Sequence, residues 1–304
     1  GVTEYIEEEP EEGSGNTGGQ GGGDVRRPDR SKFVRPTTLS HAYFTIKKHK
    51  VGKTAWRPVN GGVTTPVTAL SAVVSLALRL CIFEFDRAWE HMMRVELGVD
   101  VPYGTVLTTT DEMSQHLRQA QRMHDSPAFA DFDLLHKELL SADFSGLYDN
   151  IPRQDLIRVL RFMSRWIFAY VTNARRDMPD TWAPGSAGGA MRLLIPQYHE
   201  QKKLNARWVK GAVPPQELEG YVLVDAETLG DWCQIVIDNS YFTFGGKVWQ
   251  MIEGYPMGTP AGPSFADVYL AFYEFSFALR KFEEVRVTGV PLSSGLKYLL
   301  LLLR

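Results

Sequence analysis

The chain has 304 residues, 44% of them hydrophobic and 23% charged, and a net charge of −3, which is typical of a globular protein with one or two domains. Its two cysteines, Cys81 and Cys233, lie far apart in the sequence, which excludes a disulfide framework or a zinc-ligand spacing and favours a reducing, intracellular compartment. No signal-peptide pattern is visible, and the leucine run near the end has only five residues, so membrane insertion is not expected.

The first 31 residues are acidic and then rich in glycine, and this composition predicts disorder. Residues 1–24 hold seven acidic side chains and no Lys or Arg; without those seven negative charges the remaining 280 residues carry a net charge of +4. Residues 26–57 then contain ten Lys or Arg and one acid. Such a cluster is typical of a surface that binds polyanions, and a solvated basic linker is an equally good interpretation.

A basic β-hairpin is predicted over residues 39–59, where two strand-like runs, 42–46 and 55–59, flank a turn rich in lysine. The lysines of this turn are Lys47, Lys48, Lys50 and Lys53. Together with Arg57 on the return strand they could hold a triphosphate, and Arg57 could also stack on a base. Lys50 and its neighbour His49 equally fit a plain role as turn residues.

Apolar residues at helical spacing predict helices over 66–97 and 111–124. A short strand over 139–144 follows, and Asp143 lies near its end. A carboxylate in this place suits the binding of divalent metals for nucleotide transfer, because a strand end is rigid and the next turn exposes backbone amides. The alternative is an Asp that caps the turn into the next helix, which is predicted from after Pro152 to about Thr172.

Residues 174–222 are rich in Pro and Gly and predict no clear element. A helix over 226–238 follows, and then a hairpin over 241–250 whose Gly-Gly turn favours type I′. A Gly- and Pro-rich loop at 254–262 precedes an apolar helix over 264–281. Such a loop lets the backbone approach a base pair or a phosphate because glycine lacks a Cβ, and the alternative is an ordinary loop.

Three of these strings, in this order, resemble reverse transcriptases, most closely those of Penelope-like retroelements, which are related to telomerase. The basic hairpin resembles that family's Lys-His-Lys and Arg-Pro-Val signature, residues 143–152 resemble its Asp-x-x-x-Leu-Tyr-x-x-Ile-Pro motif, and residues 254–260 resemble Gly-x-Pro-Met-Gly-Thr-Pro. The resemblance covers residues 43–274. Three ordered matches of different chemistry are hard to obtain by chance.

The resemblance implies a role for each matching residue. Asp143 would bind a catalytic Mg²⁺ through its carboxylate and Phe144 through its carbonyl, while the amides of Gly146 and Leu147 would contact the triphosphate. Tyr148 would lie under the sugar and exclude a 2′-hydroxyl, and the alternative is a core tyrosine with one hydrogen bond. The other residues implied to contact the incoming nucleotide or the nascent base pair are Lys48, Arg57, Met257 and Gly258. The remaining turn lysines would bind nucleic acid.

The chain departs from the family at the place where its Tyr-x-Asp-Asp motif is expected. Tyr298 matches the tyrosine, but Leu300 and Leu301 stand where the two aspartates belong, and leucine cannot bind Mg²⁺. This favours a catalytically inactive copy, an error within residues 289–304, or a chain truncated before the true motif. The plain interpretation of these leucines, as part of a core strand or of a helix end, is compatible with all three alternatives.

The sequence therefore predicts an α+β fold in residues 32–304: right-hand polymerase fingers and palm, an antiparallel palm sheet backed by helices, and truncation at the last palm hairpin. The expected function is that of a retrotransposon RNA-directed DNA polymerase that binds Mg²⁺, dNTP, an RNA template and a DNA primer. Its expected location is intracellular, and nuclear if the chain is a retroelement product. Asp143, Tyr148 and Gly258 should line one cleft, with Arg57 pointing into it. The alternatives are a non-catalytic nucleic-acid-binding relic and an RNA-synthesising polymerase, which the bulky Tyr148 disfavours.

Overall fold

The computed structural model describes most of the chain after residue 65 and short strands before it. The described residues are 2–5, 39–46, 56–60, 65–98, 114, 118, 121–122, 125, 147–181, 189–197, 205–256, 258–293 and 296–297. In the strands at 2–5, 40–46 and 56–60 the description concerns chiefly the backbone.

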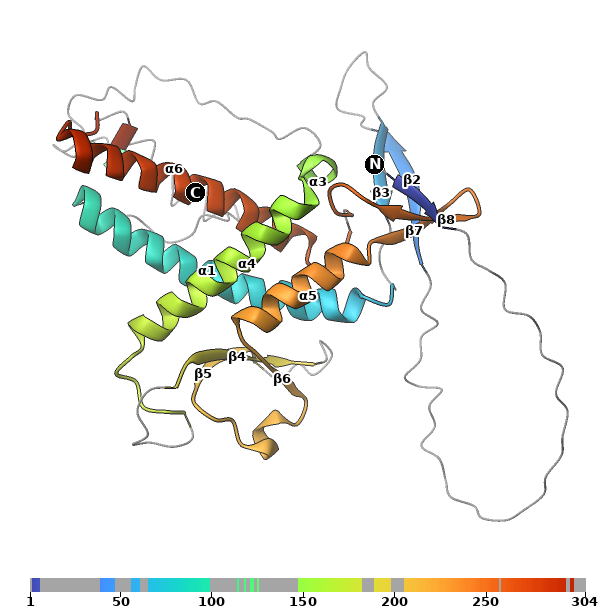
Figure 1. The fold of residues 1–304 in the computed structure, drawn as a ribbon, viewed down its shortest axis with the longest axis horizontal. Coiled ribbons are helices and arrows are strands. Elements are labelled where there is room, and N and C mark those ends of the chain that lie inside the picture. Colours follow the sequence, from blue (N-terminus) through green and yellow to red (C-terminus); the bar gives the residue numbers. More distant parts are fainter. Residues whose placement is uncertain are drawn as a thin grey trace, which may run out of the picture.

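Four long helices form the body of the molecule (Figure 1). They are α1 (Thr68–Leu97), α4 (Arg153–Ala174), α5 (Ala226–Asp238) and α6 (Gly262–Thr288). The sequence predicts a helix in each of these four places, and the four predictions are confirmed. Helix α6 extends beyond its predicted end at residue 281 and stops where Gly289 takes the left-handed conformation with φ 68°.

An aromatic cluster joins α1, α4 and α6 at the centre of the body. Phe275 of α6 lies with its ring 5.4 Å from Phe85 of α1 and 5.1 Å from Trp166 of α4. The apolar face of α4 is fully buried beside it, with Leu156 and Leu160 at 0% exposure. Each such side chain contributes roughly 1.5–3 kcal/mol when it leaves water. This core fixes α4 against α6, and thereby fixes the segments that precede the two helices.

Helix α1 is long and apolar enough, by length and composition, to span a membrane, and no other helix in the described part of the chain meets this test. Half of its most apolar 18-residue window is buried inside the protein. A core helix of a soluble protein meets the same criterion, so the finding is weak evidence for a membrane span. The apolar residues of this helix do not form one uninterrupted run, so the sequence did not indicate it as a possible membrane span.

A three-stranded antiparallel sheet begins within the Pro- and Gly-rich stretch 174–222, to which the sequence assigned no element, and its last strand extends two residues beyond it. It has β4 (Met191–Pro196) at its centre between β5 (Arg207–Lys210) and β6 (Tyr221–Val224). A 3₁₀ turn at Pro215–Leu218 joins β5 to β6. Five of the six residues of β4 are buried, so the strand lacks the apolar and polar alternation that reveals a strand in a sequence.

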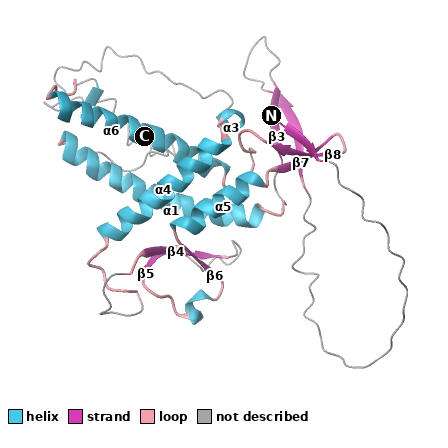
Figure 2. Cartoon of the chain, viewed as in Figure 1, coloured by secondary structure: helices cyan, strands magenta, loops and turns pink. Residues whose placement is uncertain are grey.

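A second sheet of five strands lies on another side of the helices, in the order β1-β8-β7-β2-β3 (Figure 2). Its strands are β1 (Val2–Tyr5), β2 (Ser40–Ile46), β3 (Trp56–Asn60), β7 (Tyr241–Phe244) and β8 (Lys247–Met251). All its pairs are antiparallel except β2 and β7, which are parallel. The two predicted hairpins, β2–β3 and β7–β8, are therefore confirmed and lie side by side.

The turn between β7 and β8 has the predicted geometry. Gly245 and Gly246 have φ values of 62° and 78°, and two successive positive φ angles are what a type I′ turn requires. No atom of the described residues lies within 4 Å of a Cβ built on either glycine, so the turn needs glycine for its backbone conformation and not for space.

Several predicted elements are tested only in part. The mixture of helices and small sheets confirms the α+β class. Residues 2–5 form strand β1, which pairs with β8 at the edge of the sheet. Composition assigned these residues to a disordered segment, and for them that prediction does not hold. The reason is that the run Val2-Thr3-Glu4-Tyr5 is rich in strand-forming side chains. Residues 6–31, the strand predicted over 139–144 and most of the helix predicted over 111–124 lie outside the described residues.

Candidate functional site

Two segments that belong to different predicted motifs meet between the five-stranded sheet and helix α6. The first contains the short helix α3 (Leu147–Asn150), and the second follows β8. The amide of Tyr255 donates a hydrogen bond to the carbonyl oxygen of Tyr148 at 2.9 Å, and the amide of Gly254 donates to the carbonyl oxygen of Ile151 at 3.0 Å. We call residues 147–153 and 251–258 together the motif junction.

A third contact extends the motif junction to the start of α4. The guanidinium of Arg153 donates to the carbonyl oxygen of Met251 at the end of β8. Two other nitrogens of this guanidinium, Nε and Nη2, are buried and have no hydrogen-bond partner among the described residues. Burial lowers the pKa of Arg153, against the opposing fields of Asp238 and Tyr241. Arg153 thus ties helix α4 to the sheet through one carbonyl.

Glycine is required at position 254 of the junction. Gly254 has φ 64°, a conformation that residues with a Cβ rarely adopt. A Cβ built on it would collide with the carbonyl oxygen of Tyr148 and would lie 2.8 Å from the carbonyl carbon of Asp149. The close approach of the two backbones therefore depends on the missing side chain.

Two tyrosine rings fill the junction. Tyr148 and Tyr255 lie edge to face with 5.1 Å between ring centroids, and Tyr255 lies at 88° to Phe265 of α6 at 5.6 Å. Tyr255 is 1% exposed, while Tyr148 is partly exposed. Burial, followed by the negative charge of Asp267, raises the pKa of Tyr148, so its hydroxyl stays neutral and able to donate.

Helix α1 holds the end of the Gly- and Pro-rich loop. The hydroxyl of Ser71 accepts a hydrogen bond from the amide of Ala261 at 3.0 Å, and Ser75 and Ser264 share a hydrogen bond at 3.4 Å. Within the loop, the amide of Gly262 donates to the carbonyl of Thr259 at 3.0 Å. Small side chains on α1 thus let α6 begin close to it, and they fix where the loop ends.

The structure describes only some of the residues to which the resemblance assigned a role. The motif junction contains Tyr148 and the loop of Gly258, which has φ 98°. Leu147 is partly buried and packs against the core. Arg57 lies in β3 opposite Thr45. The remaining residues lie outside the described part of the chain: Asp143, Phe144, Gly146, Met257, Lys47, Lys48, Lys50, Lys53, Tyr298, Leu300 and Leu301. A common cleft for Asp143, Tyr148 and Gly258 therefore stays a prediction.

Sequence reasoning missed two residues of the junction, Arg153 and Tyr255, and also Asp267 of α6, whose negative charge acts on Tyr148. Tyr255 occupies the variable position of the Gly-x-Pro-Met-Gly string, so the motif gave it no weight. Arg153 follows the Ile-Pro pair directly and was treated as the first residue of a helix. Asp267, the acid nearest the start of α6, was a signal that could have been noticed, because an acid is unusual in an otherwise apolar stretch.

No group of three or more His, Cys, Asp or Glu that could hold a metal is present among the residues that the structure describes. Asp143 is not among those residues. The two cysteines, Cys81 and Cys233, are free and buried, and burial raises the pKa of each thiol well above its usual range. Without a bound metal, each is therefore a protonated thiol at neutral pH.

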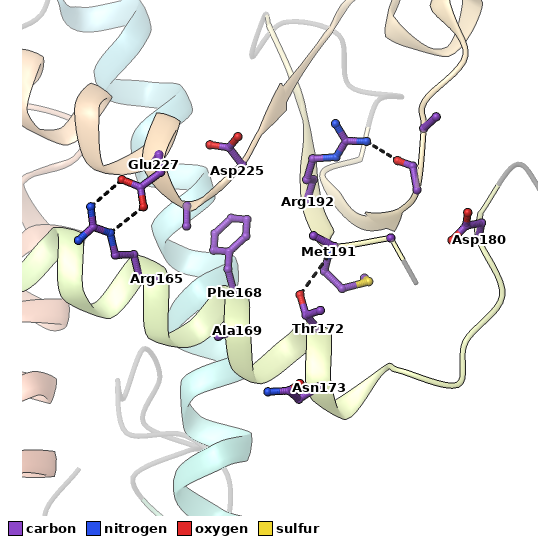
Figure 3. A pocket seen from close by; sticks show the side chains of 15 residues that line it. Arg165, Phe168, Ala169, Thr172, Asn173, Asp180, Met191, Arg192, Asp225 and Glu227 are labelled. Atoms are coloured by element: carbon purple, nitrogen blue, oxygen red, sulfur yellow. Dashed lines mark hydrogen bonds and ion pairs between the residues drawn. The ribbon is translucent and has the colours of Figure 1, made fainter. Parts of the chain in front are cut away.

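A large open pocket of about 960 Å³ lies elsewhere, along the second half of α4 (Figure 3). Its walls come from α4, the start of β4 and the start of α5, and Arg165 and Glu227 form an ion pair at 2.7 Å on its rim. Arg192 donates to the carbonyl of Gly211 across another wall. Charges of both signs line the pocket, and none of the predicted site residues that the structure describes is among its lining residues. The motif junction is therefore the better candidate for the functional site.

Comparison with protein-family models and with curated protein sequences gives no match for this chain. The functional interpretation therefore depends on the motifs and on the geometry of the junction.

Proposed function

We propose that this chain is a reverse-transcriptase-like domain of the right-hand polymerase type, with the site for an incoming nucleotide at the motif junction. The substrates would be a dNTP, an RNA template and a DNA primer. One observation carries the proposal: the Asp-x-x-x-Leu-Tyr string and the Gly-x-Pro-Met-Gly string, far apart in the chain, contact each other through the Tyr148–Tyr255 hydrogen bond and ring pair.

This contact supports the proposal because of what each string would do. The resemblance assigns Tyr148 to the sugar of the nucleotide and the Gly258 loop to the nascent base pair, and these two parts of one substrate are close together. A polymerase site therefore needs the two strings as neighbours. The strand β8 leads directly into the loop, and β7 beside it pairs with β2 of the basic hairpin, so the third string belongs to the same region.

The sequence of this chain lacks the second carboxylate pair at the positions that match the family's motif. Two-metal chemistry needs several carboxylate ligands, and the sequence offers Leu300 and Leu301 where the family has two aspartates. The proposed role of Asp143 and Phe144 as Mg²⁺ ligands leaves the site without its second carboxylate pair. We therefore assign nucleotide and nucleic-acid binding to this chain, and no step of catalysis through metal ions.

The two leucines favour a second candidate function, a polymerase-derived protein that binds nucleic acid without extending a primer. Both candidates bind nucleic acid through the same surface. They differ in whether a dNTP complementary to the template also binds at the junction. Fluorescence anisotropy of a labelled RNA–DNA primer–template measures both. We expect the chain to bind the duplex, and the complementary dNTP to strengthen this binding more than a non-complementary one.

The two candidates predict different results. Absence of duplex binding at low salt would refute both candidates. Duplex binding that no nucleotide changes would leave the non-catalytic candidate alone.

A further inference from the structure

Tyr255 is the most buried aromatic residue of the motif junction, and its hydroxyl group is buried with the ring. The side chain is 1% exposed, and its hydroxyl oxygen has no hydrogen-bond partner among the residues that the structure describes. A buried, unsatisfied hydroxyl costs free energy that a phenylalanine would not incur.

The surroundings of Tyr255 show what the residue holds. Its amide donates to the carbonyl of Tyr148 at 2.9 Å, and its ring lies against the ring of Tyr148 with 5.1 Å between centroids. Phe265 of α6 supports it from another side at 5.6 Å. Tyr255 thus contacts both the backbone and the side chain of Tyr148, while the core fixes Tyr255 itself.

We propose that Tyr255 is a positioning residue that determines sugar specificity: by fixing the ring of Tyr148, it sets how strongly the site rejects a nucleotide with a 2′-hydroxyl. This inference rests on the proposed function. A ring that excludes a hydroxyl must not move away when the hydroxyl approaches, because a mobile ring gives no steric penalty. The neighbours of Tyr255 supply that rigidity, and burial together with the fields of Tyr148 and Asp267 keeps the Tyr255 phenol neutral by raising its pKa.

The test measures a ratio of affinities, because a general loss of structure weakens all ligands alike. Equilibrium binding of dGTP and of GTP is measured with a primer–template that presents a templating C. We expect the wild-type chain to prefer dGTP by about tenfold or more. Tyr148→Ala should remove most of this preference, and Tyr255→Met should lower it by at least about threefold. Tyr255→Phe, which keeps the ring, should leave it unchanged.

A double-mutant cycle shows whether Tyr255 acts through Tyr148. If it does, the Tyr148→Ala, Tyr255→Met double variant has the same preference as Tyr148→Ala alone. Tyr170→Met is the matched control, since Tyr170 is a partly buried tyrosine stacked on Trp166 of α4, away from the junction. This control should leave the dGTP preference at the wild-type value.

The outcomes separate the inference from the proposed function. If no nucleotide binds, both fall. If dGTP is preferred and Tyr255→Met leaves the preference intact, only the inference falls. If Tyr255→Met does not fold, ¹⁹F NMR of the wild-type chain with fluorotyrosine at position 148 decides: two slowly exchanging ring orientations are expected, and a single averaged line would show a ring that Tyr255 does not hold.

Discussion

Gly254 packs directly on the carbonyl oxygen of Tyr148, and a Cβ at position 254 would overlap with that oxygen. The atoms opposing it are backbone atoms of Tyr148 and Asp149, which cannot turn away as a flexible side chain would. The left-handed φ of 64° adds a second reason for glycine at this position. One residue therefore controls how closely the two motif strings approach each other.

Gly254→Ala should destabilise the protein by about 2–4 kcal/mol, because the new Cβ must push two backbone segments apart and also adopt a strained φ. Chemical denaturation followed by circular dichroism measures this loss. Gly245→Ala is the matched control, because its φ of 62° is similar but no atom in the described part of the chain lies within 4 Å of its Cβ. Only the strain of about 1 kcal/mol then remains. Equal losses in the two variants would contradict the close approach at position 254.

The fold could be predicted from the sequence where the pattern is periodic and long. The apolar residues of α1 and α4 recur at helical spacing, and Gly245-Gly246 marks a turn by its conformational need alone. Strand β4 could not be found, because its residues are buried on both faces and carry no alternation. Short strands of this kind are defined by pairing with β5 and β6, which is a tertiary property.

The candidate site was predictable only as a set of motif strings. Nothing in the local sequence states that the Tyr255 amide reaches the Tyr148 carbonyl, because a hydrogen bond between backbone atoms leaves no residue signature. The same holds for the contact of Arg153 with Met251. Among the junction residues, only Gly254 indicates a close contact between segments. This indication is weak because glycine is common in turns that approach no other segment.

Asp155 should make the stability of the protein depend on pH in the acid range. The hydroxyl groups of Tyr269 (2.8 Å) and Tyr273 donate to one carboxylate oxygen, and Arg158 donates to the other. Burial raises the pKa of Asp155, but the hydrogen bonds from Tyr273, Arg158 and Tyr269 outweigh it and hold the pKa below its usual range. The folded pKa is therefore below the unfolded one.

A depressed folded pKa means that the stabilisation is fully present above the ordinary Asp pKa and is lost as the pH falls through the folded value. Asp155→Ala should lower the free energy of unfolding by about 1–3 kcal/mol at pH 7, since three donors lose their acceptor, and by less near pH 3. Thermal melts at several pH values measure the difference. A constant difference between pH 7 and pH 3 would show that the carboxylate is not responsible.

Nucleic-acid binding should depend on the basic hairpin. We expect charge reversal of Lys48 and Arg57 to weaken binding of the RNA–DNA duplex, because each lost phosphate contact removes a released counterion. The slope of log affinity against log salt should fall by about 1 for each residue reversed. Arg280→Glu, an exposed charge on α6, is the control and should change little. If both sets of variants bind alike, the hairpin is not the contact surface.

This chain should have no polymerase activity, and aspartates at positions 300 and 301 should restore it. The wild-type chain should extend no primer with Mg²⁺ or Mn²⁺, because Asp143 alone cannot hold two metal ions and Leu300 and Leu301 offer no ligand. The double substitution Leu300→Asp, Leu301→Asp restores the family pattern and should give measurable extension in a gel assay. The further substitution Asp143→Ala should abolish it.

Extension by the wild-type chain that Asp143→Ala removes would mean that other ligands complete the metal site. Extension by neither chain, despite duplex binding and a dNTP effect, would place the missing carboxylates elsewhere than at positions 300 and 301.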